Sequence, residues 1–389
     1  MKKKVLIFHH HGSIGGAGLS LLHIIKSIDR TKYDVSVVCP IEPPQMAKSI
    51  EDIGVRVIET KKTPVIFAHY NGGIKYAFSI RTFINLILLK KDKKNIVSII
   101  NSVEPDIIIV NSMLLSFLGK YVHNKSTEKI CFCRETYQKG LFGFRTHLIK
   151  KWMSKYFEKV VFISKYDYDS TFPCNAKRIL ITDKVEIEKY STVKKKDQSD
   201  YQNLLYLGGV AKIKGIHILL KAINYTDERV RFYLVANSQI TKKPSLFDYF
   251  MSFFKISSMS MAKVSYNGVR NKERVTILKP SSSPENYYAK SDLIVFPSTI
   301  AHQARPIYEA GAAQIPIIIS DFPETQEFAK NELNCLTFKP SNCKDLARCI
   351  NKVISDEELK NRIIKNNYDM TIRYHNYNDM AKEIDDLLI

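Results

Sequence analysis

The chain has 389 residues, of which 45% are hydrophobic and 25% are charged. These values exclude a disordered chain, and the length is sufficient for two domains of ordinary size, each with its own core. The formal net charge is +20, which favours a polyanionic neighbour such as nucleic acid, an anionic lipid surface or a phosphorylated substrate. A lysine-rich genome accounts for such an excess equally well.

Seven cysteines are present without any Cys-x2-Cys pair, so the sequence predicts neither a zinc nor a disulfide framework and favours a reducing cytosol. The basic amino terminus is followed by a run of only four apolar residues, which is too short for a signal peptide. No apolar run approaches the ~18 residues that a membrane-spanning helix needs. The sequence therefore predicts a soluble or peripheral protein of the cytoplasm.

Short apolar runs that end in turns predict six strands in the first half, at residues 5–8, 33–39, 55–59, 107–110, 129–133 and 159–164. A polar stretch at 190–202 predicts a linker. Five more strands follow, at residues 204–207, 231–235, 275–278, 293–296 and 317–319. Because helical patterns separate the strands, we predict an α/β protein with two Rossmann-like, doubly wound domains, at 1–190 and 203–365, and a C-terminal helix at 366–389.

A glycine-rich turn follows the first predicted strand and reads Gly-Ser-Ile-Gly-Gly-Ala-Gly from Gly12 to Gly18. Its spacing is neither the dinucleotide fingerprint nor a P-loop. Gly15 and Gly16 would let backbone amides approach a ligand, and the alternative is a flexible turn. Three histidines at residues 9–11 end the strand, but successive side chains of an extended chain point to opposite faces, so no metal site is predicted.

Two acidic patterns occur in the first half. Glu135 follows the strand at 129–133, where we expect it to contact a substrate or to help remove the proton of that substrate, or else to form a surface salt bridge with Arg134. Asp167 and Asp169 match the Asp-x-Asp pattern of metal–diphosphate sites. Their spacing points them to different faces of a helix that Ser164 is expected to cap, so we discount a metal role.

Three segments combine apolar with basic or aromatic residues, at 76–94, 141–157 and 244–262. The first two suit the interface of an anionic membrane, and the alternative for both is an amphipathic helix with its apolar face in the core. The third is rich in aromatic residues and methionine without clear periodicity, which fits a loop that contacts a substrate or the membrane, or a packed excursion.

The second half carries a glycine-rich turn at residues 207–215, between a strand and a helix. Its glycines let backbone approach a ligand, and Lys214 supplies a point charge for phosphate. Glu309 lies about 95 residues after Lys214, in the stretch at 291–327. This stretch predicts a strand, a polar loop, a helix that starts near Pro306 with Glu309 in its first turn, and a second strand. In such a unit the loop lies at the carboxyl end of the sheet, and a helix start there suits phosphate.

These two stretches resemble the C-terminal half-site of the family-4 retaining glycosyltransferases, which have the GT-B fold. The matching pairs are Pro297-Ser298, Glu309-Ala310 and Lys214-Gly215. Two positions depart from the family pattern, because Ala301 replaces the first Glu of a Glu-x7-Glu pair and Gly209 replaces an Arg. Some members have a His-x-Ala-Arg-Pro lead-in similar to residues 302–306, and the first glycine-rich turn resembles their Gly-Gly-Ala-Glu.

The resemblance implies a metal-independent, retaining hexosyltransferase whose two domains face each other across a cleft, with the last helix crossing back to the first domain. The implied partners are a UDP- or GDP-linked sugar as donor and a glycan or lipid-linked acceptor at an anionic membrane surface on the inner face of the cell membrane, with no nucleic acid and no separate cofactor. The candidate catalytic residues are Lys214, Glu309 and Glu135. The candidate donor-binding residues are Gly15, Gly16, Gly209, Lys212, Lys214, His302, Arg305, Pro306 and Glu309.

Two other functions compete with a transferase that builds cell-surface polysaccharide or glycolipid. One is a GT-B binding or scaffold protein that has lost catalysis, for which Ala301 and Gly209 argue. The other is an α/β enzyme of another class that binds nicotinamide or phosphate.

Overall fold

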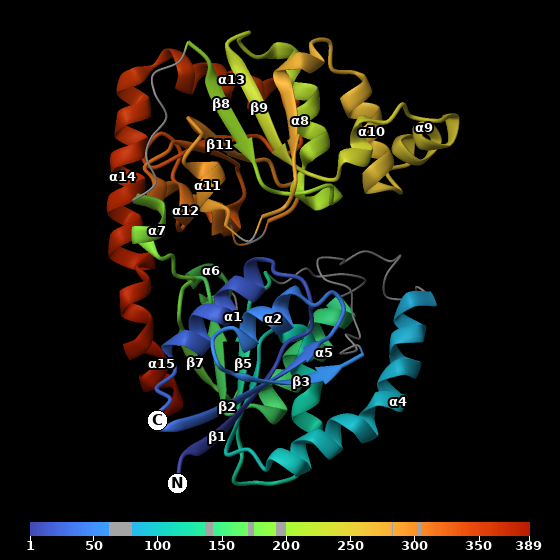
Figure 1. Ribbon diagram of the computed structural model, residues 1–389, viewed down its shortest axis with the longest axis vertical. Helices are drawn as coiled ribbons and strands as arrows, with labels where there is room; N and C mark the ends of the chain where they lie inside the picture. The colour runs from blue at the N-terminus through green and yellow to red at the C-terminus, as the bar shows by residue number, and fades with distance from the viewer. Residues whose placement is uncertain are drawn as a thin grey trace. The chain divides into compact units, whose positions relative to one another are not determined.

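The computed structural model describes residues 1–61, 80–136, 143–169, 175–191, 200–281, 283–301, 303 and 305–389. The chain divides into two compact units (Figure 1). The first is made of Met1–Lys184 and Asn378–Ile389, and the second is Val185–Tyr377. The first segment of the first unit thus ends at 184, six residues before the predicted domain end at 190, and the chain returns to this unit at 378.

The described part of the first unit forms a seven-stranded sheet in the order β3-β2-β1-β4-β5-β6-β7. Its strands are β1 (Lys3–Phe8), β2 (Tyr33–Pro40), β3 (Arg56–Thr60), β4 (Ile107–Val110), β5 (Glu128–Cys133), β6 (Lys159–Phe162) and β7 (Lys177–Leu180). Every neighbouring pair is parallel. The central strands are apolar on both faces because helices cover both sides of such a sheet. All six predicted strands are confirmed, and β7 is additional.

The helices of the first unit fill the connections between its strands. They are α1 (Gly16–Ser27), α2 (Gln45–Glu51), α4 (Ile80–Val103), the 3-10 helix η1 (Met113–Tyr121), α5 (Phe144–Tyr156) and α6 (Lys165–Asp169). In α5 the apolar face enters the core, where Ile149 and Met153 are buried and Trp152 packs edge-on against Phe117. Over its described residues, the segment predicted at 141–157 therefore packs its apolar face in the core, as the alternative of an amphipathic helix predicts.

The described part of the second unit forms a six-stranded sheet in the order β10-β9-β8-β11-β12-β13. Its strands are β8 (Gln202–Tyr206), β9 (Val230–Val235), β10 (Val275–Leu278), β11 (Leu293–Phe296), β12 (Ile317–Ser320) and β13 (Leu336–Phe338). All of its pairs are parallel too. The five predicted strands are confirmed, and β13 is additional. The predicted fold class, α/β with two doubly wound parallel sheets, is confirmed.

Helices and short 3-10 turns cover the second sheet. They are α7 (Ile187–Ser191), η3 (Lys212–Lys214), α8 (Ile216–Ala222), η4 (Ile223–Tyr225), η5 (Ser238–Thr241), α9 (Leu246–Phe253), α10 (Ser258–Asn267), η6 (Lys272–Arg274), α11 (Glu285–Tyr288), α12 (Arg305–Ala313), η7 (Pro323–Thr325), α13 (Cys343–Ser355) and α14 (Glu357–His375). The segment at 244–262, which lacked clear periodicity in the sequence, thus contains two helices. A capping box between Ser245 and Asp248 starts α9.

The last helix of the chain belongs to the first unit. After η8 (Tyr377–Asp379), α15 (Met380–Leu388) packs against α1. The Lys184 ammonium pairs with Glu383 at 2.8 Å, and Lys159 donates to the carbonyl oxygen of Leu387 at 2.7 Å. By contrast, α14 packs against α12 within the second unit, where a Cβ on Gly311 would lie 2.1 Å from the Thr371 hydroxyl.

Within the described residues, no helix is both long and apolar enough to cross a bilayer. The predicted apolar helix at 76–94 corresponds to α4, whose first described residue is Ile80 and which continues to Val103. Residues 76–79 of that prediction lie outside the described part of the chain.

Candidate functional site

Each sheet has one place where the strand order reverses direction. In the first unit this switch point lies between β1 and β4, and in the second it lies between β8 and β11. Open α/β sheets bind ligands at the carboxyl ends of the two strands that flank a switch point. The glycine-rich turn after β1 and the turn after β8 both follow such a strand, as does the loop that leads from β11 to α12. The topology therefore places all three predicted motifs at the carboxyl ends of the strands, where open α/β sheets bind ligands.

One buried phenol holds the glycine-rich turn after β8. The Tyr206 hydroxyl lies 2.9 Å from the carbonyl oxygen of Gly209 and 3.1 Å from that of Lys214, so it bonds to both ends of the turn. Gly215 has φ +74°, and a Cβ there would lie 1.7 Å from the Pro297 carbonyl oxygen. Gly209 has φ +69° in open space. An Arg at 209 would be strained in this left-handed conformation, which gives a physical reason for the glycine that departs from the family pattern.

The two lysines of the turn have different surroundings. Lys214 is half-buried, with its ammonium 5.3 Å from the centre of the Phe296 ring at the end of β11. Burial lowers the pKa of Lys214 to about 8, because desolvation disfavours the charged form. Lys212 is exposed, and its ammonium donates to the carbonyl oxygen of Lys255 at 3.3 Å. Lys214 is thus the cation that lies beside the strand ends, whereas Lys212 is directed toward the connection between α9 and α10.

Hydrogen bonds join this turn to the loop after β11. The Thr299 amide donates to the carbonyl oxygen of Ile213 at 2.9 Å, and the Thr299 hydroxyl lies 3.3 Å from that of Lys212. The lysine-bearing turn and the loop that leads into α12 therefore form one connected edge.

The helix α12 begins as the sequence predicts. Its first residue is Arg305 and Pro306 is the second, where the missing amide hydrogen of proline costs nothing. Ala301, in the loop before it, is only 4% exposed. His302, one of the predicted donor-binding residues, lies outside the described residues.

Glu309 lies one residue beyond the first turn of α12, in the second turn rather than the predicted first. It is 5% exposed. Arg305 Nε donates to one carboxylate oxygen at 2.9 Å, and the Tyr288 hydroxyl donates to the other at 2.8 Å. Burial, and then the negative charge of Glu309, raise the pKa of Tyr190, whose ring packs edge-on against Tyr288. The predicted ribose-binding carboxylate is thus oriented by protein groups before any ligand arrives.

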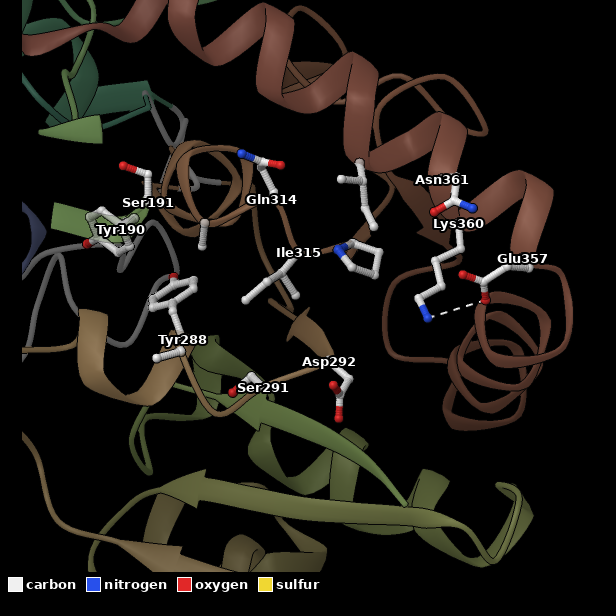
Figure 2. A pocket seen from close by; sticks show the side chains of 14 residues that line it. Tyr190, Ser191, Tyr288, Ser291, Asp292, Gln314, Ile315, Glu357, Lys360 and Asn361 are labelled. Atoms are coloured by element: carbon white, nitrogen blue, oxygen red, sulfur yellow. Dashed lines mark hydrogen bonds and ion pairs between the residues drawn. The ribbon is translucent and has the colours of Figure 1, made fainter. Parts of the chain in front are cut away.

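A cavity of about 300 Å³ lies on the other edge of the same sheet (Figure 2). Its lining includes Tyr190 and Tyr288, together with Asp292, Gln314 and Pro316. Asp292 and Pro316 immediately precede β11 and β12, so the cavity opens at the amino ends of these strands. It is therefore distinct from the edge that carries Lys214, and it is not the predicted donor site.

The glycine-rich turn of the first unit leads into α1. Gly15 is the residue before the helix and Gly16 is its first residue. Among the residues that the structure describes, a Cβ on either would meet nothing within 4 Å, so packing against those residues does not require these glycines. Gly12 differs, because a Cβ there would lie 2.3 Å from the Pro43 carbonyl oxygen. Gly12 is thus needed by the fold, and the open space at Gly15 and Gly16 leaves their backbone accessible.

Buried polar groups meet at the carboxyl ends of β1, β4 and β5. Asn111 Nδ2 lies 3.1 Å from His9 Nδ1, and Asn111 Oδ1 accepts from Arg134 Nε at 2.6 Å. Arg134 also donates to Asp183 at 3.1 Å, and Asp183 accepts from the Ser20 hydroxyl at 2.6 Å. Burial is the largest cause that lowers the pKa of His9 well below its usual value. These groups form a network that ties the strand ends to α1.

Glu135 lies in the interior beside this network. It is 2% exposed, and it accepts hydrogen bonds from the Ser112 hydroxyl and, at 3.2 Å, from the Met113 amide. Burial raises the pKa of Glu135 to about 7, against the opposing effect of the Ser112 hydrogen bond. A surface salt bridge with Arg134, one of the two alternatives from the sequence, is wrong because both side chains are buried and Arg134 pairs with Asp183.

The Asp-x-Asp pattern has the structure predicted for it. The Ser164 hydroxyl accepts from the amide of Asp167 and donates to its carboxylate at 2.7 Å, so it caps α6. Asp167 is buried, whereas Asp169 pairs with Lys165 at the surface. Among the described residues, no group of three His, Cys, Asp or Glu side chains is arranged to hold a metal ion.

Sequence reasoning missed several residues of these edges. Asn111 is the first polar residue after the wholly apolar strand β4, and that position at a strand end was a usable signal. The phenols Tyr206 and Tyr288 and the carboxylate Asp183 gave no such signal, because their partners are defined only by packing.

The fold and these edges define a class: a two-unit, doubly wound α/β protein with a glycine-rich turn at the switch point of each sheet and a lysine at one of them. Residues 188–370 match the family described as glycosyl transferases group 1. These residues make up just under half of the chain and are similar to group 1 glycosyltransferases, so the resemblance drawn from the sequence is confirmed at that level. The family-4 retaining subclass stays a prediction.

Two curated relatives align with part of the chain. An uncharacterized glycosyltransferase of Methanocaldococcus jannaschii is 25% identical over 187 residues, which make up 48% of this chain and 44% of that protein. The capsular polysaccharide biosynthesis glycosyltransferase CapM of Staphylococcus aureus is 23% identical over 190 residues, or 46% and 45% of the two chains. The matched region spans less than half the length of these relatives.

A solved structure resembles the whole chain. The crystal structure of Anabaena HepE in complex with UDP and glucose superposes with a TM-score of 0.74 at 16% identity, over 99% of both chains. Similarity at this level of identity establishes the fold, which is GT-B as predicted.

Proposed function

We propose that the protein is a retaining glycosyltransferase that moves a hexose from a UDP- or GDP-linked donor to a polysaccharide or glycolipid acceptor. The observation that carries the proposal is the connected edge at the β8–β11 switch point. There the turn that carries Lys214 is hydrogen-bonded to the loop that leads into α12, within residues that match the group 1 glycosyltransferase family. The HepE complex with UDP and glucose supports a nucleotide sugar as the donor.

The chemical task is to stabilise a nucleoside diphosphate as it leaves. The bond between the anomeric carbon and the phosphate oxygen breaks, and the acceptor oxygen forms the new bond on the same face of the sugar. The acceptor proton passes to an oxygen of the departing phosphate. Lys214 and the positive end of the α12 dipole oppose the charge that develops on the diphosphate, and their environment is already partly desolvated. These groups act without a metal ion in the proposed mechanism.

Glu309 is proposed to accept the hydroxyls of the ribose. An ionised carboxylate has about four acceptor sites, so the bonds from Arg305 and Tyr288 leave capacity for a ligand. Those same bonds fix the carboxylate in one orientation, which reduces the entropy lost when a donor binds.

The acceptor is inferred from a relative. CapM is named for capsular polysaccharide biosynthesis, which supports a cell-surface glycan as the product. The inner face of the cell membrane, which the resemblance in the sequence implies, is proposed as the place of the reaction. The alternative, a binding protein that has lost turnover, rests on Ala301 and Gly209. The φ of +69° at Gly209 shows that this departure is accommodated by the backbone, but it does not replace the missing charge.

A panel of nucleotide sugars tests the proposal. We expect UDP or GDP to raise the unfolding temperature, and one UDP- or GDP-linked hexose to be hydrolysed slowly even without acceptor. We expect Glu309→Gln to raise the donor KM about tenfold, because a charge-assisted bond to the ribose becomes a neutral one. Tyr288→Phe is the matched control, since it removes a bond to Glu309 without removing the carboxylate, and we expect a smaller rise.

Three outcomes would contradict parts of this proposal. Binding of nucleoside diphosphate without turnover of any sugar would favour the scaffold alternative. Protection by NAD(P) and by no nucleoside diphosphate would favour another enzyme class. Loss of activity in EDTA, restored by a divalent cation, would refute metal independence.

A further inference from the structure

Helix α9 exposes a large apolar surface. None of its residues is buried, and Leu246 and Phe253 are 90% and 80% exposed. We call the α9 patch the set of exposed apolar residues Leu246, Phe247, Phe250, Phe253 and Phe254. Ile256, two residues further on, is also exposed. Contiguous apolar surface of this kind is uncommon on soluble proteins and marks interaction sites.

The patch occupies one face of the helix. At about 100° per residue, its five members fall within an arc of about 120°. Asp248 lies on the opposite side of the helix and faces α10, where it accepts from the Ser260 hydroxyl at 2.8 Å and from the Lys263 ammonium at 3.3 Å. Tyr249 also meets α10, through a 3.2 Å hydrogen bond from Asn267. The polar side of α9 is thus anchored to the protein, and the apolar side is turned outward.

Positive charge surrounds the patch. Lys242 and Lys243 precede α9, Lys255 follows it, and all three are exposed. Asp248 is the only acidic residue between 242 and 262, and its charge is held on the far side by hydrogen bonds that lower its pKa to about 2, the largest effect being that of the Ser245 amide. The outward surface therefore combines aromatic rings with uncompensated ammonium groups.

The α9–α10 pair projects from the second unit. Within that unit, α10 packs against α8, and α9 packs on α10 at the edge opposite α14 (Figure 1). The helix α9 therefore packs on α10, and its outward face does not pack against the described strands of the sheet.

We infer that the α9 patch inserts into the interface of a bilayer that contains anionic phospholipid. Short amphipathic helices lie in the plane of the interface with aromatic and leucine side chains among the acyl chains and lysines at the headgroups. Anionic lipid attracts the flanking lysines, and this attraction weakens with salt. A symmetric pair of protein copies joined through the patch would instead bring like-charged lysines together, which disfavours self-association.

The proposed function puts the reaction at a membrane but does not say which surface of the protein contacts the bilayer. The inference names that surface. It does not rest on catalysis, because the patch is built by α9 and not by the switch-point residues. The sequence allowed a membrane contact at the segments 76–94 and 141–157, with a core helix as the alternative for both, and also at 244–262. The described part of 141–157 is a core helix, so 244–262, in the other unit, is a stronger candidate than 141–157.

Vesicle sedimentation with the full chain tests the inference. We expect binding to phosphatidylcholine vesicles that contain about a third phosphatidylglycerol, weaker binding to pure phosphatidylcholine, and a further decrease in high salt. The variant Phe247→Ser/Phe250→Ser/Phe253→Ser should bind at least about tenfold more weakly. The matched control, Leu180→Ser/Leu333→Ser/Ile389→Ser, removes three apolar side chains exposed elsewhere and should bind like the wild type.

The charge contribution has its own matched pair. Lys242→Ala/Lys243→Ala/Lys255→Ala should lose most of the preference for anionic lipid. Lys125→Ala/Lys290→Ala/Lys382→Ala changes the net charge equally at exposed sites away from α9 and should keep that preference.

Insertion itself is measured by the tryptophan fluorescence of the variant Phe253→Trp. We expect its emission to shift to the blue with anionic vesicles and to be quenched by brominated acyl chains, whereas Leu333→Trp should show neither effect.

Undiminished vesicle binding by the triple Phe→Ser variant, or no quenching of the tryptophan at 253, would overturn the inference. A dimer that this variant abolishes, seen by analytical ultracentrifugation without any lipid binding, would assign the patch to a second copy instead. Protection by UDP or GDP should be equal in wild type and variant, so a failed transferase proposal stays distinguishable.

Discussion

At the switch point of the first unit, buried polar side chains pair with one another, whereas the switch point of the second unit presents a lysine beside an aromatic ring. In the first unit, Arg134 is neutralised by Asp183 and the strand ends are tied to α1. In the second, burial lowers the pKa of Lys214, so keeping its ammonium charged in the folded state costs free energy. In the first unit the charge thus ties elements together, whereas in the second we propose that it serves a ligand.

The sharpest test of this contrast is Lys214→Met, which keeps the packing against Phe296 and removes the charge. We expect turnover to fall about 10²–10³-fold because the leaving diphosphate loses its main cation. The unfolding temperature should stay the same or rise, since a partly desolvated ammonium is replaced by an apolar side chain. Activity and thermal unfolding measure the two effects, and Lys221→Met, at an exposed site on α8, is the control. Unchanged turnover would place the site elsewhere.

In the first unit, Asp183→Asn is expected to lower the stability of the fold, whereas Lys214→Met in the second unit is expected to leave stability unchanged or to raise it. Asp183→Asn removes the carboxylate charge that pairs with the buried Arg134 guanidinium, so urea unfolding should show a loss of about 3 kcal/mol. The exposed pair of Asp227 and Arg229 is the control, and Asp227→Asn should cost less than about 1 kcal/mol. The double variant Asp183→Leu/Arg134→Met should be less destabilised than Asp183→Asn. Equal losses at both pairs would remove the distinction between the two kinds of charge.

A smaller effect is expected from Glu135, whose protonation makes the free energy of unfolding depend on pH. Its folded pKa of about 7 lies above the usual 4.5, so between these values the native state retains a proton that the unfolded state releases. Stability from this group is therefore present at low pH and is lost as pH rises through about 7. Relative to the wild type, Glu135→Gln should gain about 2 kcal/mol between pH 5.5 and pH 8. A pH-independent difference between the two proteins in urea unfolding would show that Glu135 is already ionised at pH 5.5.

Most of the fold could be predicted from the sequence because central parallel strands are buried on both faces. Runs such as Ile107–Val110 and Ile317–Ser320 are almost wholly apolar and stand out against any background. The two strands that were missed, β7 and β13, lie at the edges of their sheets. Of these, β7 is largely exposed and β13 has only three residues, so neither carries an apolar run of diagnostic length. The helix α9 was missed as well, although the Ser245–Asp248 capping box was readable.

The candidate site was only partly predictable. Local spacing indicated Lys214 and the start of α12, because glycine and proline mark turns and helix starts through their own backbone preferences. The groups that orient these residues come from elsewhere in the chain. The phenol that bonds Glu309 lies 21 residues earlier, and the carboxylate that pairs with Arg134 lies 49 residues later. Such contacts follow from packing of whole elements and leave no periodic trace in the sequence.

The return of the chain to the first unit has a consequence for biosynthesis. A ribosome delivers Met1–Lys184 first, yet α15 becomes available only after all of Val185–Tyr377 has been made. Until then α1 lacks the helix that packs on it, and Lys184 and Lys159 lack their partners on α15. The second unit, which is continuous in the chain, therefore has all of its residues outside the ribosome before the first unit does. Folding during translation should finish in the reverse of the order in which synthesis begins.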